Sequence, residues 1–232
     1  MNVIGIIGAM DEEVDILVEV MNVGEIVEKA SLKFYKGTIE NKEVILVRCG
    51  IGKVNAALCA QILISEFKVD AVVNTGVAGA LHEDLDVADI VISTDAVQYD
   101  VDARTFGYAK GTIPRMEASE FVADERLINA AYNSTVKQLH SNKVLKGRVA
   151  TGDIFISSKE LKDELINDFN AHCGEMEGAA IAHVCSVNKT PFVIIRAMSD
   201  KADGSANMVY EEFVHIAAAN SKDIVLNMLK EI

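Results

Sequence analysis

The sequence predicts a single α/β domain in which helices flank a central mixed β-sheet. Short apolar runs alternate with longer segments of helical periodicity, as expected when strands and helices alternate along a chain. Several of the apolar runs are continuous, which is typical of strands buried on both faces. Half of the residues are hydrophobic, and no segment rich in glycine, serine and proline divides the 232 residues. We therefore expect one domain over residues 1–232.

The first part of the chain predicts a strand, a helix, a hairpin and a second helix. The run VIGIIG is rich in β-branched residues, and three acidic residues follow it, where the dipole of a helix stabilises negative charge. Two apolar runs around Asn41 and Lys42 predict the hairpin. The expected elements are a strand over 3–8, a helix from Asp11 with Val14, Leu17, Val18 and Met21 on one face, strands over 32–39 and 43–48, and a helix over 54–67.

The rest of the chain continues the alternation. The expected elements are strands over 70–74 and 89–93, the second extending as far as residue 99, a loop over 100–117, a helix over 124–139, a strand over 146–150, a helix over 158–168, a strand over 192–195 and a helix over 209–229. Gly/Ala turns follow three strands, and Ser199 with Asp200 follows a fourth. Because α/β sheets bind ligands at the carboxyl ends of their strands, we expect these four turns to form one pocket.

The charge balance argues against some classes of partner. Acidic residues outnumber basic ones by 35 to 22, which gives a net charge of −13. A nucleic-acid-binding protein needs a basic face to neutralise phosphates, so neither nucleic acid nor an anionic membrane is an expected partner. No apolar run approaches the ~18 residues of a membrane-spanning helix, and the N-terminus lacks the features of a signal peptide. We expect a soluble, cytoplasmic protein.

The cysteines and histidines do not indicate a metal site. Cys49, Cys59, Cys173 and Cys185 lack metal-binding spacing and lie among apolar or small residues, so we expect buried free thiols in a reducing compartment. No motif pairs a serine or cysteine nucleophile with a histidine. The sequence predicts no metal and no cofactor, and its chemistry is expected to use carboxylates, arginine, hydroxyl groups and the backbone.

The segment Gly174–Asp200 contains a group of polar residues suited to chemistry. Glu175 and Glu177 precede an Ala-rich helical pattern, and Arg196 follows the next buried strand. Acids two residues apart cannot share a face of a helix, so either both lie at a strand–helix junction or one of them is structural. A carboxylate in an apolar segment is costly to bury without a partner, and Arg196 is the candidate partner.

Two further carboxylates and a glycine-rich turn are candidates. Glu13 lies at a helix start, where charge usually serves the dipole, but it precedes Val14 on the side that leads to the core. Asp200 follows Ser199, and here a helix N-cap or an Asx turn is the alternative to a catalytic role. The GIGK turn at 50–53 lacks the spacing and the hydroxyl of a Walker motif, so we expect it to bring the backbone close to a ligand.

Six segments of the chain occur in the order and spacing of one enzyme family. They are IGIIGAMDEEV, GIGKVNAA, NTGVAGAL, TGDIFI, EMEGAAIAHV and RAMSDKAD. Together they resemble the 5′-methylthioadenosine/S-adenosylhomocysteine nucleosidases, from residue 3 to the C-terminal helix. The resemblance implies a nucleoside phosphorylase-like fold and a role in methionine salvage. It also implies hydrolysis of the N-glycosidic bond of 5′-methylthioadenosine, S-adenosylhomocysteine and also 5′-deoxyadenosine, with release of adenine and, from the first two, a 5-thioribose.

The resemblance also implies two catalytic residues. Glu13 is similar to the carboxylate that activates the attacking water, and Arg196 to the residue that helps position it. Asp200, supported by Ser199, resembles the acid that protonates adenine N7. Departure of adenine leaves an oxocarbenium-like ribosyl cation, so a protonated carboxyl would assist departure while an ionised one serves the water. Asp200 would then need a pKa raised by burial, and Glu13 would need to remain charged beside Arg196.

The same resemblance implies the contacts of the substrate. Met176 and Glu177 resemble the ribose contacts, and Ile156 matches the position whose backbone recognises the adenine edge. The full set of implied substrate-binding residues is Ala9, Met10, Ile51, Ala78, Gly79, Phe155, Ile156, Glu175, Met176, Glu177, Arg196, Ser199 and Tyr210. Phe106 and Pro114 resemble residues that cap the 5′-thio end of the neighbouring subunit's site, which implies a homodimer.

Two positions depart from the family pattern. Val77 stands where many relatives have a serine that can help bind the water, which puts that contact in doubt but not the reaction. Tyr210 stands where the family often has Phe, and its hydroxyl could adjust the preference for the 5′-substituent.

Three other functions are weighed against this one. Phosphorolysis needs cationic groups around phosphate, whereas Glu13 would repel an anion, and a rate that requires phosphate would indicate it. A nucleosidase acting on 6-amino-6-deoxyfutalosine is compatible with the sequence. A non-catalytic nucleoside-binding protein would not require both acids, Glu13 and Asp200.

Overall fold

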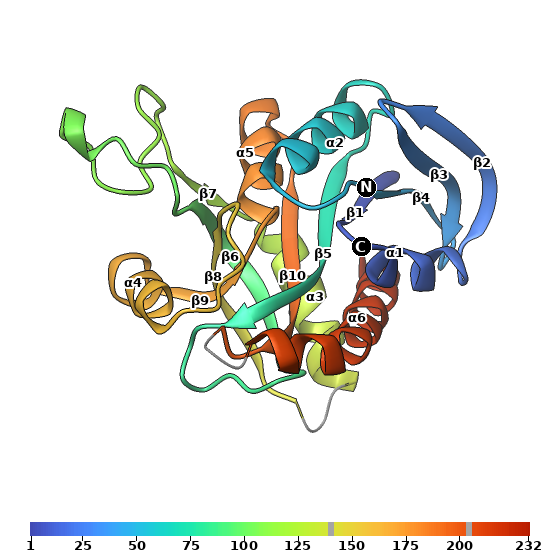
Figure 1. The fold of residues 1–232 in the computed structure, drawn as a ribbon. Helices are drawn as coiled ribbons and strands as arrows, with labels where there is room; N and C mark the ends of the chain where they lie inside the picture. Colours follow the sequence, from blue (N-terminus) through green and yellow to red (C-terminus); the bar gives the residue numbers. More distant parts are fainter. Residues whose placement is uncertain (139–141, 203–205) are drawn as a thin grey trace.

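The computed structural model describes residues 1–138, 142–202 and 206–232, and it confirms the predicted mixed α/β architecture (Figure 1). Within these ranges, ten strands form one mixed sheet. The strands are β1 (Val3–Gly8), β2 (Asn22–Lys29), β3 (Leu32–Ile39), β4 (Lys42–Arg48), β5 (Ala71–Ala80), β6 (Ile90–Gln98), β7 (Glu120–Val122), β8 (Val144–Thr151), β9 (Ala171–Glu175) and β10 (Phe192–Asp200). The helices are α1 (Asp11–Val18), α2 (Lys53–Ser65), α3 (Glu125–Gln138), α4 (Lys159–Phe169), α5 (Gly178–Asn188) and α6 (Ala206–Glu231), with a 3₁₀ helix, η1 (Arg104–Phe106).

Five of the strands close into a ring. Strand β10 pairs with β6, β6 with β8, β8 with β9 and β9 with β5, and β5 pairs again with β10. The pairs β5–β10, β6–β8 and β8–β9 are parallel, whereas β6–β10 and β5–β9 are antiparallel. On its other edge β5 pairs with β1, from which β4, β3 and β2 continue as an open wing. Because the ring is closed, strands that are far apart in the sequence lie next to one another around a common interior.

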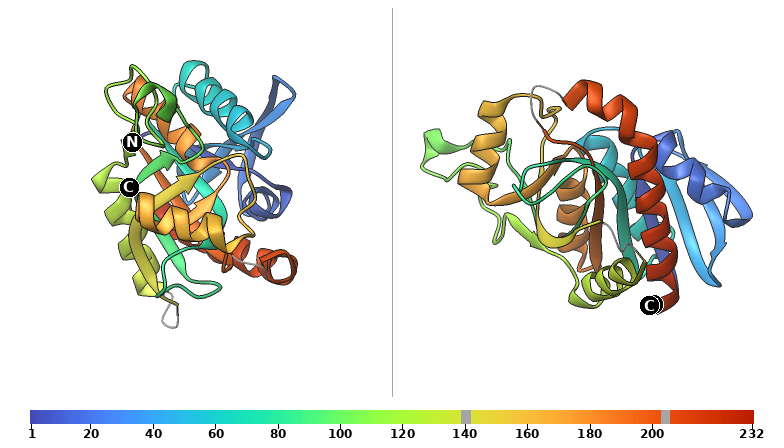
Figure 2. Two further views of the ribbon diagram at one scale, coloured as in Figure 1. Left: turned by 60° about the vertical axis from the view of Figure 1, so that its left-hand side comes forward. Right: turned by 90° about the horizontal axis from the view of Figure 1, so that it is seen from below.

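Helices cover both sides of the sheet. Helices α2 and α5 lie together on one side, and α1, α3 and α6 lie on the other (Figures 1 and 2). Strands β1, β5 and β10 run between these layers and are buried along nearly their whole length. This explains why their sequences are continuously apolar rather than alternating, as predicted.

Two strands extend further than the sequence predicted. Strand β5 continues to Ala80 rather than ending at Asn74, and β10 continues to Asp200 rather than ending at Ile195. Small residues disfavour strands, but here the two strands pair with each other, and each bond of the ladder satisfies a buried backbone group. Part of each predicted turn is therefore strand, and Arg196 lies inside β10.

The sequence analysis missed three strands and placed one helix end wrongly. Strand β2 is exposed along almost its whole length, so it lacks the apolar alternation that identifies a strand, and β7 and β9 are short. Helix α1 ends at Val18, so Met21 reaches the core from outside the helix. The remaining helices and strands lie close to their predicted ranges.

The loop over residues 100–117 projects away from the sheet (Figure 2). It contains η1, in which the ring of Phe106 is 82% exposed. An ion pair between Lys110 and Glu164 ties the loop to α4.

Two predictions about the chain as a whole can be compared with the structure. All four cysteines are free and buried, as predicted. Among the helices of the described ranges, none has the length and apolarity that crossing a membrane requires.

Candidate active site

A cavity of about 410 Å³ opens where the ends of β5, β9 and β10 meet the residues that follow β1 and β8. It is lined by Ala9, Met10, Glu13, Ile51, Val77, Ala78, Gly79, Ile154, Phe155, Ile156, Gly174, Glu175, Met176, Glu177, Ser199 and Asp200. The expected convergence of the strand ends is therefore observed. Most lining groups are apolar, and the polar exceptions are carboxylates and one hydroxyl, a composition suited to a small organic ligand.

Glu13 is buried at the cavity and held by three backbone N–H groups. Its Oε2 accepts hydrogen bonds from Ala9 N (2.6 Å) and Met10 N (3.1 Å), and its Oε1 accepts one from Val77 N (3.0 Å). Burial raises the pKa of Glu13, and the positive charge of Arg196 and the backbone hydrogen bonds lower it only in part. The carboxylate is thus fixed in place and more basic than an ordinary glutamate, as a general base requires.

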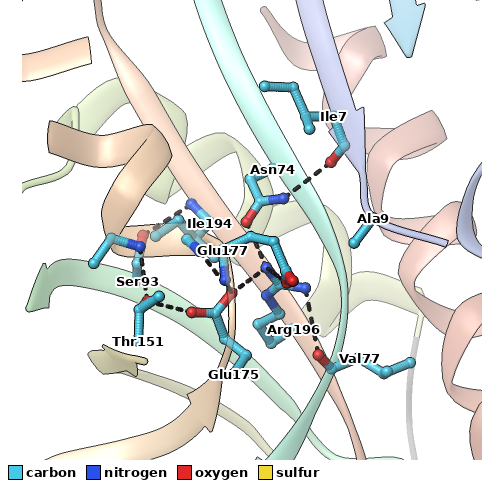
Figure 3. A network of polar contacts seen from close by, with 12 residues as sticks. Ile7, Ala9, Asn74, Val77, Ser93, Thr151, Glu175, Glu177, Ile194 and Arg196 are labelled. Carbon is cyan, nitrogen blue, oxygen red and sulfur yellow. Dashed lines mark hydrogen bonds and ion pairs between the residues drawn. The ribbon is translucent and has the colours of Figure 1, made fainter. Parts of the chain in front are cut away.

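Arg196 lies behind the cavity and organises its acids (Figure 3). It is 1% exposed, and its guanidinium donates to Asn74 Oδ1 (2.6 Å), to the Val77 carbonyl (3.3 Å) and to Glu175. Burial lowers the pKa of Arg196, but the neighbouring carboxylates raise it by more, so the charge is retained. Asn74 is itself held by the Ile7 carbonyl at 3.0 Å. Besides its own strand, three strands therefore orient the guanidinium: β5 and β9 directly, and β1 through Asn74.

Glu175 is occupied by the protein itself. Its Oε2 pairs with Arg196 and accepts hydrogen bonds from Glu177 N (3.2 Å) and Gly178 N (2.7 Å), at the start of α5. Its Oε1 accepts a hydrogen bond from Thr151 Oγ1 (Figure 3). Both alternatives for this pair of acids are confirmed: they lie at a strand–helix junction, because β9 ends at Glu175 and α5 begins at Gly178, and one of them, Glu175, is structural.

Glu177 keeps more hydrogen-bonding capacity than its neighbour. Its Oε1 accepts a hydrogen bond from Gly52 N (2.8 Å), and its Oε2 lies 3.7 Å from Arg196 Nη2. Burial and the negative charge of Glu175 raise the pKa of Glu177, while Arg196 and the Gly52 N–H lower it in part. A carboxylate at the cavity wall with free lone pairs can accept hydrogen bonds from a ligand's hydroxyl groups.

Asp200 is 2% exposed and lies on another wall of the same cavity. Its Oδ1 accepts a hydrogen bond from Ala202 N (2.7 Å), and its Oδ2 accepts one from Ser199 Oγ (2.8 Å). The bond to the backbone two residues on is the Asx turn that the sequence left open. The turn and a place at the cavity are compatible, because the turn uses Oδ1, whereas the hydrogen bond to Oδ2 comes from a hydroxyl group that can rotate.

Glycines leave the space that these side chains occupy. A Cβ at Gly76 would collide with the side chains of both Glu13 and Arg196, and one at Gly79 would lie 3.0 Å from Asp200 Oδ1. A Cβ at Gly174 would collide with Ile156. The small residues after Asn74 therefore serve the packing of charged side chains, in addition to bringing the backbone close to a ligand.

The structure brings together nearly all of the predicted site residues. Arg196 supports the cavity from behind rather than lining it, whereas Phe106 and Pro114 lie in the exposed projecting loop. Tyr210 falls in α6, and its side chain is outside the described part of the structure.

Sequence reasoning missed the supporting residues Asn74, Thr151 and Gly76. Their types are unremarkable, and only the pairing of strands puts them beside the acids. The sole signal was their place in the motifs NTGVAGAL and TGDIFI.

The site offers acid–base chemistry. Within the described residues, no group of three or more histidine, cysteine or acidic side chains has the arrangement of a metal site. Two buried acids at one cavity, Glu13 and Asp200, with different surroundings, are suited to act as base and acid on opposite sides of one bond. The buried negative charge would also stabilise a substrate that becomes cationic.

Comparison with known proteins agrees with this geometry. The model of the family described as the phosphorylase superfamily matches residues 3–230. A 5′-methylthioadenosine/S-adenosylhomocysteine nucleosidase of Staphylococcus carnosus is 46% identical over 230 residues, which are 99% of this chain and 100% of the relative. The crystal structure of such a nucleosidase from Neisseria meningitidis, in complex with methylthio-immucillin-A, is 39% identical with a TM-score of 0.96 and covers 100% of both chains. The futalosine hydrolase of Helicobacter pylori is 36% identical with a TM-score of 0.94, over 100% of this chain and 98% of the other.

Proposed function

The chain belongs to the phosphorylase superfamily and, within it, to the 5′-methylthioadenosine/S-adenosylhomocysteine nucleosidases, and we propose that it hydrolyses the N-glycosidic bond of both nucleosides to release adenine and a 5-thioribose. The observation that carries the proposal is the pair of buried acids, Glu13 and Asp200, on the walls of one cavity of nucleoside size. As an N-glycosyl hydrolase, the protein must solve two problems: adenine is a poor leaving group, and water is a weak nucleophile.

In this proposal Glu13 activates the water. Its three backbone hydrogen bonds fix the carboxylate, and its raised pKa makes it a stronger base than an exposed glutamate. The water would lie between Glu13 and the ribose carbon that loses adenine, near Arg196. Proton transfer to a positioned carboxylate contributes roughly 10²–10⁴-fold to the rate.

Asp200 supplies the proton for the leaving group. It is buried, and Ser199 Oγ donates a hydrogen bond to one of its carboxyl oxygens. A protonated Asp200 donates to adenine N7, so that adenine leaves as a neutral base rather than as an anion. The Ala202 N–H holds the other oxygen and thereby orients the carboxyl group.

Glu177 and Met176 bind the ribose. Glu177 is held by Gly52 and still has lone pairs for the 2′- and 3′-hydroxyls. As the ribose becomes cationic, these hydrogen bonds strengthen, which stabilises the transition state more than the bound substrate. Ile156 and Phe155 line the cavity, and in this proposal their backbone groups bind the edge of adenine.

The charge of the site favours water over phosphate as the nucleophile. Three carboxylates surround the single guanidinium of Arg196, so phosphate would enter a region of excess negative charge. The direct test is adenine release from 5′-methylthioadenosine in phosphate-free buffer. We expect full activity there, and a rate that requires phosphate would overturn the hydrolase assignment.

One observation favours a second candidate substrate. The Helicobacter pylori futalosine hydrolase matches this fold as closely as several nucleosidases do, so 6-amino-6-deoxyfutalosine is an alternative occupant. The two substrates share adenine and ribose and differ at the 5′ position. Comparing kcat/KM for both, side by side, decides between them.

The active protein is proposed to be a cytoplasmic homodimer. Exposed Phe106, on a loop that projects from its own subunit, supports this assembly, because such a side chain can close the 5′ end of a neighbouring site. Ile51 and Phe155, at the cavity, are also 54% and 42% exposed, and a second subunit would cover them.

A further inference from the structure

The residue that precedes helix α2 donates a hydrogen bond to Glu177, one of the acids of the site. Gly52, the residue before the helix, donates its N–H to Glu177 Oε1 at 2.8 Å. Helix α2 has no side-chain cap at Gly52 and no acidic residue in its first turn. Gly50 and Gly52 both adopt positive φ angles, 85° and 97°, so this turn depends on outside contacts for its position. The geometry around Glu177 therefore depends on whatever fixes the start of α2.

A closed set of hydrogen bonds fixes the start of α2. Asp153 Oδ1 accepts from Lys53 N (2.8 Å), across 100 residues of sequence, and Asp153 N donates to Asp100 Oδ2 (3.1 Å). Asp100 Oδ1 in turn receives the Lys53 ammonium at 2.6 Å. The cycle returns to the residue at which it began. We call these three residues, Lys53, Asp100 and Asp153, the anchor cycle.

The anchor cycle is attached to a rigid part of the molecule. The ring of Tyr99 fills the space beside Gly152, and the Tyr99 hydroxyl lies 3.4 Å from the Ile154 carbonyl. Gly152 N donates to the Glu175 carbonyl at 3.1 Å. The side chains of Lys53 and Asp100 are only 18% and 20% exposed, so their ion pair is less screened than one at the surface. Asp153 thus connects a fixed segment to a turn that is flexible by itself.

We propose that Asp153 is a positioning residue for the reaction, which accepts the Lys53 N–H and thereby keeps the Gly52 N–H aimed at Glu177. The proposal rests on the ribose-binding role proposed for Glu177. Asp153 does not belong to the lining of the described cavity, so it acts through the start of α2 and not by touching the substrate. Its removal weakens the hold on the ribose hydroxyls and leaves the acids Glu13 and Asp200 in place.

The test compares Asp153→Ala with Asp153→Asn, which keeps an acceptor for Lys53 N. Asp163→Ala, on the exposed face of α4, is the matched control. Adenine release from 5′-methylthioadenosine and from its 2′,3′-dideoxy analogue is measured for each protein. For Asp153→Ala we expect kcat/KM on the ribonucleoside to fall about tenfold, which corresponds to about 1.4 kcal/mol of lost interaction. The dideoxy analogue should lose little, and Asp153→Asn and Asp163→Ala should resemble the wild type.

A second variant breaks the cycle at another bond. Asp100→Ala removes the partner of the Lys53 ammonium and of Asp153 N, and should show the same dependence on the ribose hydroxyls. Since the Gly52 N–H lowers the pKa of Glu177, its displacement should also move the acid limb of the pH–rate profile to higher pH in both alanine variants. In the Glu177→Ala background, Asp153→Ala should have no further effect on the ribonucleoside.

The outcomes separate this proposal from the proposed function. If the wild type releases no adenine, the enzymatic assignment fails. If the wild type is active and Asp153→Ala matches it, or loses equally on the ribonucleoside and the dideoxy analogue, the positioning role is overturned. A loss confined to the ribonucleoside, rescued by Asn, supports it.

Discussion

The carboxylate of Glu175 and the guanidinium of Arg196 form an ion pair whose side chains are only 2% and 1% exposed. The ion pair also connects two elements of the site, because Glu175 binds the start of α5 while Arg196 binds β5. The two acids on either side of Met176 in the motif therefore differ in their tasks. Glu175 neutralises and orients the arginine, and Glu177 keeps the lone pairs proposed to bind the ligand.

Glu175→Ala should destabilise the protein severely. The substitution leaves the Arg196 charge buried with a weaker partner and removes the acceptor of two N–H groups at the start of α5. Breaking a buried ion pair on one side costs about 3–5 kcal/mol. Urea unfolding monitored by circular dichroism measures the change, with Glu28→Ala on the exposed strand β2 as the control. A loss below about 1 kcal/mol, the range of an ordinary surface substitution, would contradict the structural role.

Asp200→Asn should abolish adenine release and preserve ligand binding. The amide has the shape of the carboxyl group and can still accept from Ala202 N, but its N–H groups are far too weakly acidic to transfer a proton to adenine N7. We expect kcat to fall by roughly 10²–10⁴-fold. Isothermal titration with an immucillin-type inhibitor should still detect binding. Full activity in this variant would exclude Asp200 as the acid.

Glu13→Gln should lose activity and some stability together. A carboxamide has a single acceptor oxygen, so its NH₂ group must face either Val77 N or the N–H groups of Ala9 and Met10. Two N–H donors that point at each other cost about 1–3 kcal/mol of stability. Loss of the base lowers kcat by roughly 10²–10⁴-fold. Stopped assays of adenine and thermal melts give the two values. Glu12→Gln, one residue earlier in α1, should change neither by much.

The buried acids should make the ligand-free protein more stable below neutral pH. The folded-state pKa of Glu177 is raised above its ordinary value of 4.5, mainly by burial, so the folded state binds more protons than the unfolded state in the interval above 4.5. Stability from this group is therefore complete below about pH 4.5 and falls as the pH rises through the raised pKa. Urea unfolding from pH 5 to 8 should show the wild type losing stability relative to Glu177→Gln. A difference that is constant with pH would show that the pKa is not raised.

Mixing two impaired variants tests the proposed homodimer. Glu13→Gln lacks the base, and Phe106→Ala lacks the side chain proposed to close the neighbouring site. In a mixed dimer, the site of the Phe106→Ala subunit retains its own Glu13 and receives Phe106 from the other subunit, so activity should rise above that of either parent. Equilibrium mixing followed by an adenine assay measures the gain. A sum of the parent activities would argue against a shared site.

The sequence predicted much of the fold because the central strands carry their own signal. Strand β1 and the first part of β10, residues 192–195, are apolar on both faces and rich in β-branched residues, so they are recognised without a structure. Strand β9 has the sequence AHCGE and no such pattern, yet it is held by pairing with β8 and β5. Its existence depends on neighbours that are distant in the sequence.

Local patterns in the sequence predicted acids at the start of two helices, and an arginine and an acid after one strand. The role of each of them depends on contacts between distant segments. Closure of the ring placed Arg196 against Glu175, and the packing of α2 against α5 placed the start of α2 against Glu177. The reason is physical, because the pKa and the free lone pairs of a carboxylate depend on burial and on hydrogen-bond donors within a few ångströms, and these come from segments that local sequence does not connect.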